Sequence, residues 1–167
     1  RTSSREATRR EGRHPTSMSK YPHIAAKIYD APWLIDPSHH RNIARQFEAH
    51  ITGARADVAT GDMEPNDDEP RLVGSVQIIP VHGILGKHLS QLEMMCGGCS
   101  VDEVGEAIDE AEADPRVQTI LLDFRSPGGT VTGVPELGNK IAGCTKTTAA
   151  FTDSQCCSGA LWLASCC

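Results

Sequence analysis

The sequence of 167 residues contains no apolar run of about 18 residues, so it predicts no membrane-spanning helix. The basic N-terminal stretch "RTSSREATRREGR" is not followed by an apolar segment, so we expect no signal peptide there. The formal net charge is −6, and no basic stripe is present to neutralise nucleic-acid phosphates. These absences argue against both a membrane protein and a nucleic-acid-binding protein.

A disulfide framework is also missing, although the chain contains seven cysteines. Four of them form two adjacent pairs in the apolar stretch "CCSGALWLASCC", as expected of small buried residues in a reducing compartment. Cys96 and Cys99 form a C-x-x-C pair, for which a zinc or redox role stays open as the less favoured alternative. No second ligand pair has a matching spacing, so the sequence predicts no metal and no other cofactor.

Composition divides the chain into four segments. The N-terminal segment contains the extended stretch "APWLIDPS", after which Ser38 is expected to cap a helix that ends at His50. The last segment stops within an apolar, helix-like pattern, so we expect it to be incomplete at its C-terminal side. The four segments are a disordered tail (1–20), an extended and helical segment (21–52), an acidic linker (53–70) and a folded domain (71–167).

The folded domain alternates buried strands with amphipathic helices. "RLVGSVQIIPVHGIL" is apolar on both faces, as in a strand that is covered on both sides. "SVDEVGEAIDEAEADP" predicts a helix that Ser100 caps together with Glu103. The strand "VQTILLDF" comes next, then a helix from Pro135 to Gly143, the strand "TTAAFTD" and the helix start "SGALWLAS". This order predicts an α/β fold with a mainly parallel sheet.

Two junctions after predicted strands have the composition of a site, because ligands bind where parallel strands end. "SPGG" (126–129) is either a simple turn or an oxyanion hole, in which bare backbone N–H groups face a developing negative charge. In "DSQCCSGALWLA", Ser158 is either the N-cap of a helix or a nucleophile. Its neighbours Cys157 and Gly159 leave the backbone uncrowded, and the positive helix end would favour an alkoxide.

Three stretches, "IIPVHGIL", "ILLDFRSPGGTVTGVPEL" and "AAFTDSQCCSGALWLAS", together resemble the signal peptide peptidase A (protease IV) family of serine peptidases. The soluble phage branch, of the head-maturation protease or minor capsid protein C type, is the most similar. The resemblance covers roughly residues 72–167 and implies a ClpP/crotonase-like fold of stacked β-β-α units. It also implies cleavage of polypeptides by a serine nucleophile and a lysine base, homo-oligomers, capsid proteins as partners, and a cytoplasmic or prohead location.

The resemblance assigns site residues by position. Ser158 matches the catalytic nucleophile, and the two glycines of "SPGG" match those whose amides line the oxyanion hole. The following "TVTG" resembles the edge that pairs with the substrate backbone by strand addition. His82, at the end of a strand, is interpreted as structural. The predicted oxyanion and substrate-binding residues are Gly128, Gly129, Thr130, Val131 and Gly159.

The general base is where the sequence departs from the family. The family's lysine follows the serine at a long distance, whereas no lysine follows Ser158 here. Lys87 could approach the cleft, but a base must be desolvated, and none of the lysines present is assigned to the role. We expect the base beyond Cys167. Two alternatives stay open: an inactive copy that serves as a capsid assembly scaffold, and a crotonase-type acyl-CoA enzyme, which the missing basic patch disfavours. The five lysines are Lys20, Lys27, Lys87, Lys140 and Lys146.

Overall fold

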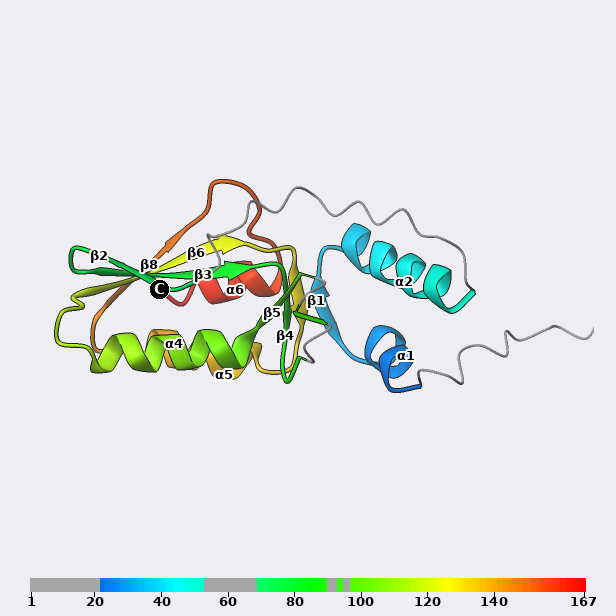
Figure 1. Ribbon diagram of the computed structural model, residues 1–167, viewed down its shortest axis with the longest axis horizontal. Helices are drawn as coiled ribbons and strands as arrows, with labels where there is room; N and C mark the ends of the chain where they lie inside the picture. Colours follow the sequence, from blue (N-terminus) through cyan, green and yellow to red (C-terminus); the bar gives the residue numbers. More distant parts are fainter. Residues whose placement is uncertain (1–21, 53–68, 90–92, 95–96) are drawn as a thin grey trace, which may run out of the picture.

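The computed structural model describes residues 22–52, 69–89, 93–94 and 97–167 (Figure 1). The predicted tail and nearly all of the predicted linker lie outside these residues. The elements are α1 (Pro22–Tyr29), β1 (Trp33–Ile35), α2 (Pro37–Thr52), β2 (Arg71–Val73), β3 (Val76–His82), β4 (Ile84–Gly86), β5 (Gly98–Ser100), α4 (Val101–Ala113), β6 (Thr119–Arg125), β7 (Gly128–Thr130), α5 (Val134–Ala142), β8 (Thr147–Phe151) and α6 (Gly159–Ala164).

The described strands form two sheets of four strands each. The longer strands give the order β2-β3-β6-β8, in which β3, β6 and β8 are parallel and β2 is antiparallel to β3. The shorter strands give the order β1-β7-β4-β5, in which only the β1–β7 pair is antiparallel. Figure 1 shows β4 and β5 at one end of the longer strands, beside β1. The predicted α/β class with a mainly parallel sheet is confirmed.

Three stacked β-β-α units build the domain, as the resemblance implied. In the first unit, β3 is followed by the short strands β4 and β5 and then by α4; in the second, β6 is followed by β7 and α5. In the third, β8 is followed by an isolated parallel bridge between Ser126 and Cys156 and then by α6. Each long strand therefore ends at a corner. After β3 and β6 the chain enters the second sheet, and after β8 it forms the bridge to Ser126. Both predicted site loops lie at such corners.

The stretch 71–85 was predicted as one strand, and this is wrong. The chain turns back at Gly74, which has a φ of 62°, so that β2 and β3 form a hairpin. It turns again at Gly83, which has a φ of 94° and where a β-carbon would lie 2.2 Å from the carbonyl oxygen of Gly97. The apolar residues of this stretch predicted a strand that is covered on both sides, but β2 is mostly exposed and Val73 is 57% exposed.

The predicted helices of the domain are confirmed. Ser100 is the N-cap of α4, and its side chain accepts a hydrogen bond from the Glu103 amide. Gly133, with a φ of 90°, precedes α5, and Gly143 ends it. Figure 1 shows α4 and α5 side by side on one face of the longer sheet. No helix of the described residues is long and apolar enough to cross a membrane.

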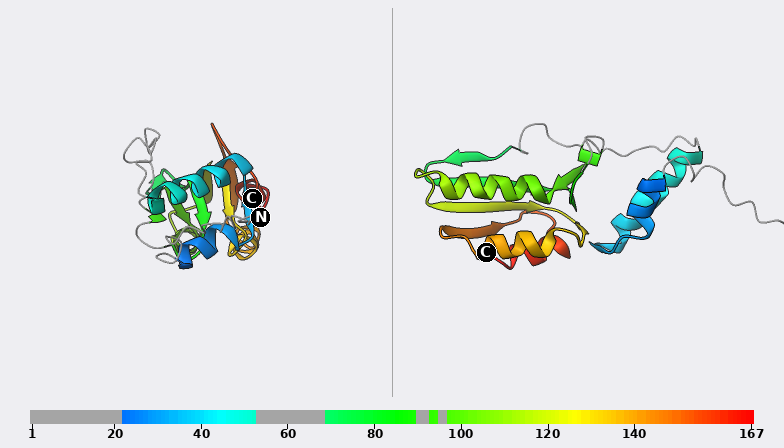
Figure 2. Two further views of the ribbon diagram at one scale, coloured as in Figure 1. Left: turned by 90° about the vertical axis from the view of Figure 1, so that its right-hand side faces the viewer. Right: turned by 90° about the horizontal axis from the view of Figure 1, so that it is seen from below.

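One hydrophobic core joins the sheet to the three helices that follow its strands. The apolar stripe predicted for α4 is part of this core, in which Ile108 is 1% exposed. No residue before Ile79 belongs to the buried cluster within the described ranges. The helical segment 22–52 therefore lies outside the core of the domain. The view from below in Figure 2 shows its helices beyond the end of the longer strands. The core residues buried completely include Leu85, Ile120, Leu122, Phe124, Val134, Ala160 and Leu163.

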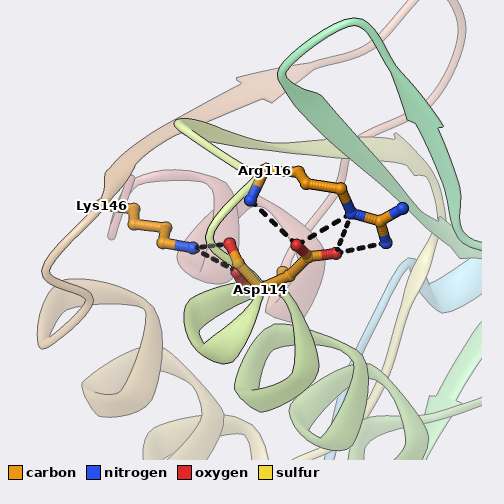
Figure 3. Close-up of polar contacts among 4 residues, drawn as sticks. Asp114, Arg116 and Lys146 are labelled. Atoms are coloured by element: carbon orange, nitrogen blue, oxygen red, sulfur yellow. Dashed lines mark hydrogen bonds and ion pairs between the residues drawn. The ribbon is translucent and has the colours of Figure 1, made fainter.

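A polar cluster holds the end of α4 against the start of β8 (Figure 3). The Arg116 guanidinium donates to the Asp114 carboxylate at 2.6 Å, and the Lys146 ammonium donates to the carbonyl oxygens of Ala111 and Asp114, both at 2.6 Å. Hydrogen bonds from the Arg116 side chain and amide lower the pKa of Asp114 to about 2. This cluster precedes β6 and β8, so it braces the end of the parallel strands opposite to the site loops.

The N-terminal segment consists of two helices joined by β1. The first helix, α1, was not predicted, and the second begins at Pro37 and ends at Thr52 rather than His50. Ser38 was expected to cap α2, and this is wrong: the Asp36 carboxylate accepts a hydrogen bond from the Ser38 amide at 2.8 Å, so Asp36 caps the helix. A proline is favoured at the first position of a helix, which places the cap one residue before it.

Candidate active site

Backbone hydrogen bonds bring the two predicted site loops together. The Ser126 amide donates to the carbonyl oxygen of Gln155 at 2.7 Å, and the Cys157 amide donates to the carbonyl oxygen of Ser126 at 3.1 Å. These bonds align the "SPGG" loop in parallel with residues 155–157. The next residues of each loop are Pro127 to Gly129 on one side and Ser158 on the other. The positions that the sequence assigned to one site are therefore neighbours in space.

Ser158 is exposed and has an unusual backbone conformation. It precedes α6 with a φ of 53° and a ψ of −115°. Among the described residues other than glycine, only His88 and Ser158 have a positive φ. Such a conformation costs roughly 1–3 kcal/mol and is found most often at functional sites. The Ser158 side chain makes no capping hydrogen bond, so the structure does not support the simple N-cap interpretation.

Gly128 packs directly against the residues on either side of Ser158. It has a φ of 96°, and a β-carbon on it would lie 3.1 Å from both the carbonyl oxygen of Cys157 and the amide nitrogen of Gly159. Gly159 is itself buried. A side chain at position 128 would therefore separate the two loops, which explains why the sequence has a glycine there.

The amides of the predicted oxyanion residues point in different directions. The Gly128 amide donates to Oγ of Ser126 at 3.2 Å, and that hydroxyl donates to the carbonyl oxygen of Gly83 at 2.6 Å. The amide of Gly128 is therefore used within the protein, and this glycine contributes to the site by leaving space beside Ser158. Gly129 lies in β7. Gly159 is the first residue of α6, so no carbonyl of a preceding helical turn accepts the Gly159 amide. The amides of Gly129 and Gly159 are therefore the donors that could face a ligand.

The predicted substrate edge is paired with the chain's own β1. Thr130 lies opposite Trp33, and the Val131 amide donates to the carbonyl oxygen of Pro32 at 3.0 Å. At the other end, the Asp36 amide donates to the carbonyl oxygen of Pro127 at 3.0 Å. The edge of β7 that is predicted to bind an extended substrate is therefore already paired with β1.

The contacts of the described lysines lie away from Ser158. Lys27 pairs with Glu93 at 3.0 Å, and Lys87 lines a pocket between α4 and the start of α5. Lys140 pairs with Asp109, and Lys146 belongs to the cluster at the end of α4. None of these contacts involves Ser158 or the glycine loop. Lys20 lies outside the described residues.

A buried carboxylate beside the site was missed by the sequence analysis. Asp123, near the end of β6, is 8% exposed, and its Oδ2 lies 3.3 Å from Nε2 of His82 and 3.8 Å from the Arg125 guanidinium. The contact between His82 and Asp123 joins β3 to β6, and the structural role of His82 stays a prediction. The signal in the sequence was an acidic residue inside the apolar run "ILLDF".

An apolar pocket between the end of β8 and α6 adjoins the loop that contains Ser158. Its lining includes Phe151, Cys157 and Leu161, and burial raises the pKa of the neighbouring Cys156 thiol. No group of three or more His, Cys, Asp or Glu residues in the described ranges could hold a metal ion. Cys99 is buried, and Cys96 lies outside the described residues, so the C-x-x-C pair is not described.

Two curated phage proteins are similar to the chain, and they confirm the resemblance to the phage head-maturation branch. The chain is 28% identical over 148 residues to the capsid assembly protease C of Escherichia phage lambda. It is 27% identical over 165 residues to the head-tail preconnector protein GP5 of Enterobacteria phage P21. The matches cover 75% and 87% of this chain but only 33% of each relative, so the chain spans about a third of their length.

Two solved structures resemble the fold at 18% sequence identity. One is a probable enoyl-CoA hydratase from Mycobacterium smegmatis, with a TM-score of 0.44 over 59% of this chain and 46% of the other. The second is an enoyl-CoA hydratase/isomerase family member, with a TM-score of 0.46 over 59% of this chain and 44% of the other. No family model matches the sequence.

Proposed function

We propose that the chain is part of a serine endopeptidase of the phage capsid-maturation type, with Ser158 as its nucleophile. Its substrates and partners would be capsid proteins, and it would act as a homo-oligomer in the prohead or in the cytoplasm. The two phage relatives support the biological setting. The chemistry is argued below from the residues of this chain.

One observation carries the proposal: an exposed serine with a positive φ lies directly beside a glycine bend. Hydrogen bonds between Ser126 and residues 155–157 fix the two loops against each other. Ser158 has a positive φ, and its side chain makes no hydrogen bond to the end of the helix that it precedes. A helix cap alone would need neither the strained backbone nor the glycine neighbours.

In the proposed reaction, Oγ of Ser158 attacks the carbonyl carbon of the scissile peptide bond. The carbonyl oxygen becomes an oxyanion that accepts hydrogen bonds from the amides of Gly129 and Gly159. Collapse of this intermediate expels the amine and leaves an acyl-enzyme, which water hydrolyses. Preorganised amides of this kind are worth about 10²- to 10³-fold in kcat each. Thr130 and Val131 would hold the substrate backbone in an extended conformation by strand addition.

The base that takes the proton from Ser158 is proposed to be a lysine outside the described residues. Each of the four described lysines is held by carboxylates or carbonyl oxygens, or lines a pocket elsewhere. None of these contacts brings a lysine ammonium to the hydroxyl of Ser158, as a base in the reaction would require. The same observation favours the second candidate, an inactive copy that serves as a capsid assembly scaffold.

Covalent labelling separates the two candidates. A fluorescent fluorophosphonate reacts only with a serine that has an activated hydroxyl and an oxyanion hole. The intact protein should be labelled on the peptide that contains Ser158, and Ser158→Ala should not be labelled. Ser154→Ala, which removes an exposed serine four residues earlier, is the matched control and should be labelled like the wild type.

Equal labelling of Ser158→Ala would show that another residue is the nucleophile. A folded intact protein that is never labelled, even when the groove described below is opened, would favour the scaffold. Circular dichroism of each variant shows whether it is folded.

A further inference from the structure

The edge of β7 (Gly128–Thr130) beside Ser158, called the substrate groove below, is paired with a strand from the chain's own N-terminal segment. β1 pairs with β7 so that Leu34 lies opposite Gly129. The bonds from Val131 to Pro32 and from Asp36 to Pro127 lie two residues away on either side. Hydrogen-bonded and non-hydrogen-bonded pairs alternate in an antiparallel ladder, so Leu34 and Gly129 occupy a hydrogen-bonded position.

The carbonyl oxygen of Leu34 lies where the proposed mechanism places the scissile carbonyl. A β-carbon on Gly128 would lie 2.1 Å from this oxygen, and one on Gly159 would lie 3.2 Å from it. The register adds Gly129 as a third neighbour. The three glycines assigned to the oxyanion and substrate site therefore surround one atom, and that atom belongs to β1.

The segment that carries β1 is built as a separate unit. Trp33 and His40 both contact the carbonyl oxygen of Ile28, at 3.1 Å and 2.9 Å, and the rings of Tyr29 and Phe47 are 6.5 Å apart. None of its residues belongs to the buried cluster of the domain. The segment could therefore leave the groove as a unit without opening the domain core. Figure 1 shows both helices beyond the end of the sheets, with β1 nearest to them.

We infer that β1 is an internal ligand of the substrate groove, which it closes to other polypeptides until the N-terminal segment is displaced. Leu34 takes the place of the residue that precedes the cleaved bond, and Ile35 takes the place of the residue that follows it. The groove then prefers an extended, apolar sequence that runs antiparallel to β7. This inference rests on the proposed function for the meaning of the site, but the occupation of the groove can be tested by itself.

The test uses the intact protein and the variant Leu34→Pro. Proline removes the N–H that pairs with Gly129 and so weakens β1. Leu34→Ala is the matched control, because it shortens the same side chain but keeps the N–H. The probe is a fluorescent synthetic peptide with the sequence of residues 30–38, and its binding is measured by anisotropy. Amide hydrogen exchange at Val131 reports whether the edge is paired.

The expected result is slow exchange at Val131 in the wild type and in Leu34→Ala, with rapid exchange in Leu34→Pro. The peptide should bind Leu34→Pro at least about tenfold more tightly than the wild type, as expected if the groove is open in no more than about one wild-type molecule in ten. Bound peptide should restore slow exchange. Labelling of Ser158 by the fluorophosphonate should be faster in Leu34→Pro by a similar factor and slowed again by the peptide.

Rapid exchange of Val131 in the wild type would overturn the inference, and so would equal peptide binding by all three proteins. If the peptide binds Leu34→Pro selectively but Ser158 stays unlabelled, the groove is self-occupied and the peptidase proposal fails. The two failures are therefore distinguishable. Should Leu34→Pro not fold, as judged by circular dichroism, exchange at Val131 in the wild type still decides whether the strand is in place.

Discussion

The amide nitrogen of Gly128 lies 3.2 Å from Oγ of Ser126, a side chain with no exposed surface. The same hydroxyl donates to Gly83 at the first corner of the domain. One buried hydroxyl thus joins two consecutive β-β-α units and fixes the orientation of the glycine bend. The Gly128 amide is satisfied inside the protein, so that a ligand carbonyl meets the next amide along the chain.

Replacing Ser126 by alanine should therefore destabilise the protein and disturb the site together. Ser126→Ala leaves the Gly83 carbonyl and the Gly128 amide without this partner, and a buried unsatisfied group costs about 1–3 kcal/mol. Urea unfolding should show a loss of this size, with slower labelling of Ser158. Ser154→Ala, at an exposed position, should change the unfolding free energy by less than about 0.5 kcal/mol. An unchanged labelling rate in Ser126→Ala would show that the hydroxyl does not position the bend.

The positive φ of Ser158 predicts that two substitutions at this position differ in their free energy of unfolding. Both Ser158→Ala and Ser158→Gly remove the proposed nucleophile, but only glycine adopts a φ of 53° without strain. We expect Ser158→Gly to be more stable than Ser158→Ala by roughly 1 kcal/mol, since strain at a single residue of this kind is worth about 1–3 kcal/mol. Thermal and urea unfolding measure the difference. If the alanine variant is the more stable one, the backbone at this position is not strained.

Gly128→Ala should lower the free energy of unfolding much more than Gly74→Ala, although both glycines have a positive φ. A β-carbon at Gly128 would meet the carbonyl oxygen of Leu34 at 2.1 Å, whereas one at Gly74 would meet nothing within 4 Å. Both glycines have a positive φ, so Gly74→Ala is a control for conformational strain alone. We expect a cost of about 1 kcal/mol at Gly74. Gly128→Ala should cost more, release β1 and abolish labelling of Ser158. Similar costs would show that the backbone at 128 moves freely.

The Asp114 cluster predicts an acid-sensitive contribution to stability. The folded-state pKa of Asp114 is lowered from 3.8 to about 2, so its contribution is fully present above pH 4 and is lost as the pH falls towards 2. Asp114→Asn should be less stable than the wild type at neutral pH, and the difference should shrink across this window. Arg116→Gln removes the main donor and should act in the same way. Urea unfolding between pH 2 and 6 measures the effect, and a difference that does not vary with pH would contradict it.

The sequence predicted the regular part of the fold well because that part depends on local signals. The apolar spacing of α4, its Ser100 cap and the glycine that ends α5 are readable within a few residues. The hairpin of β2 and β3 was not predicted because only Gly74 and Ser75 separate the two strands, and the stretch was interpreted as one strand. The short helix α1 begins at Pro22, a start signal of the same kind as Pro37 in α2, and the sequence analysis did not use it.

The residue types of the site could be predicted from the sequence, but the contacts between them could not. The glycine pair and Ser158 could be found from their places at strand ends. The direction of the Gly128 amide depends on the Ser126 hydroxyl, and nothing in the sequence fixes that contact. Pairing between Leu34 and Gly129 joins positions far apart in the chain, with no shared periodicity to reveal it.

The parallel bridge between Ser126 and Cys156 makes the site sensitive to chain length. Successive residues of an extended chain point to opposite sides. Insertion of one residue between Cys156 and Ser158 would keep all the existing side chains, but it would turn the Ser158 hydroxyl to the other side of the glycine bend. We therefore expect the two corners to tolerate substitutions better than insertions or deletions.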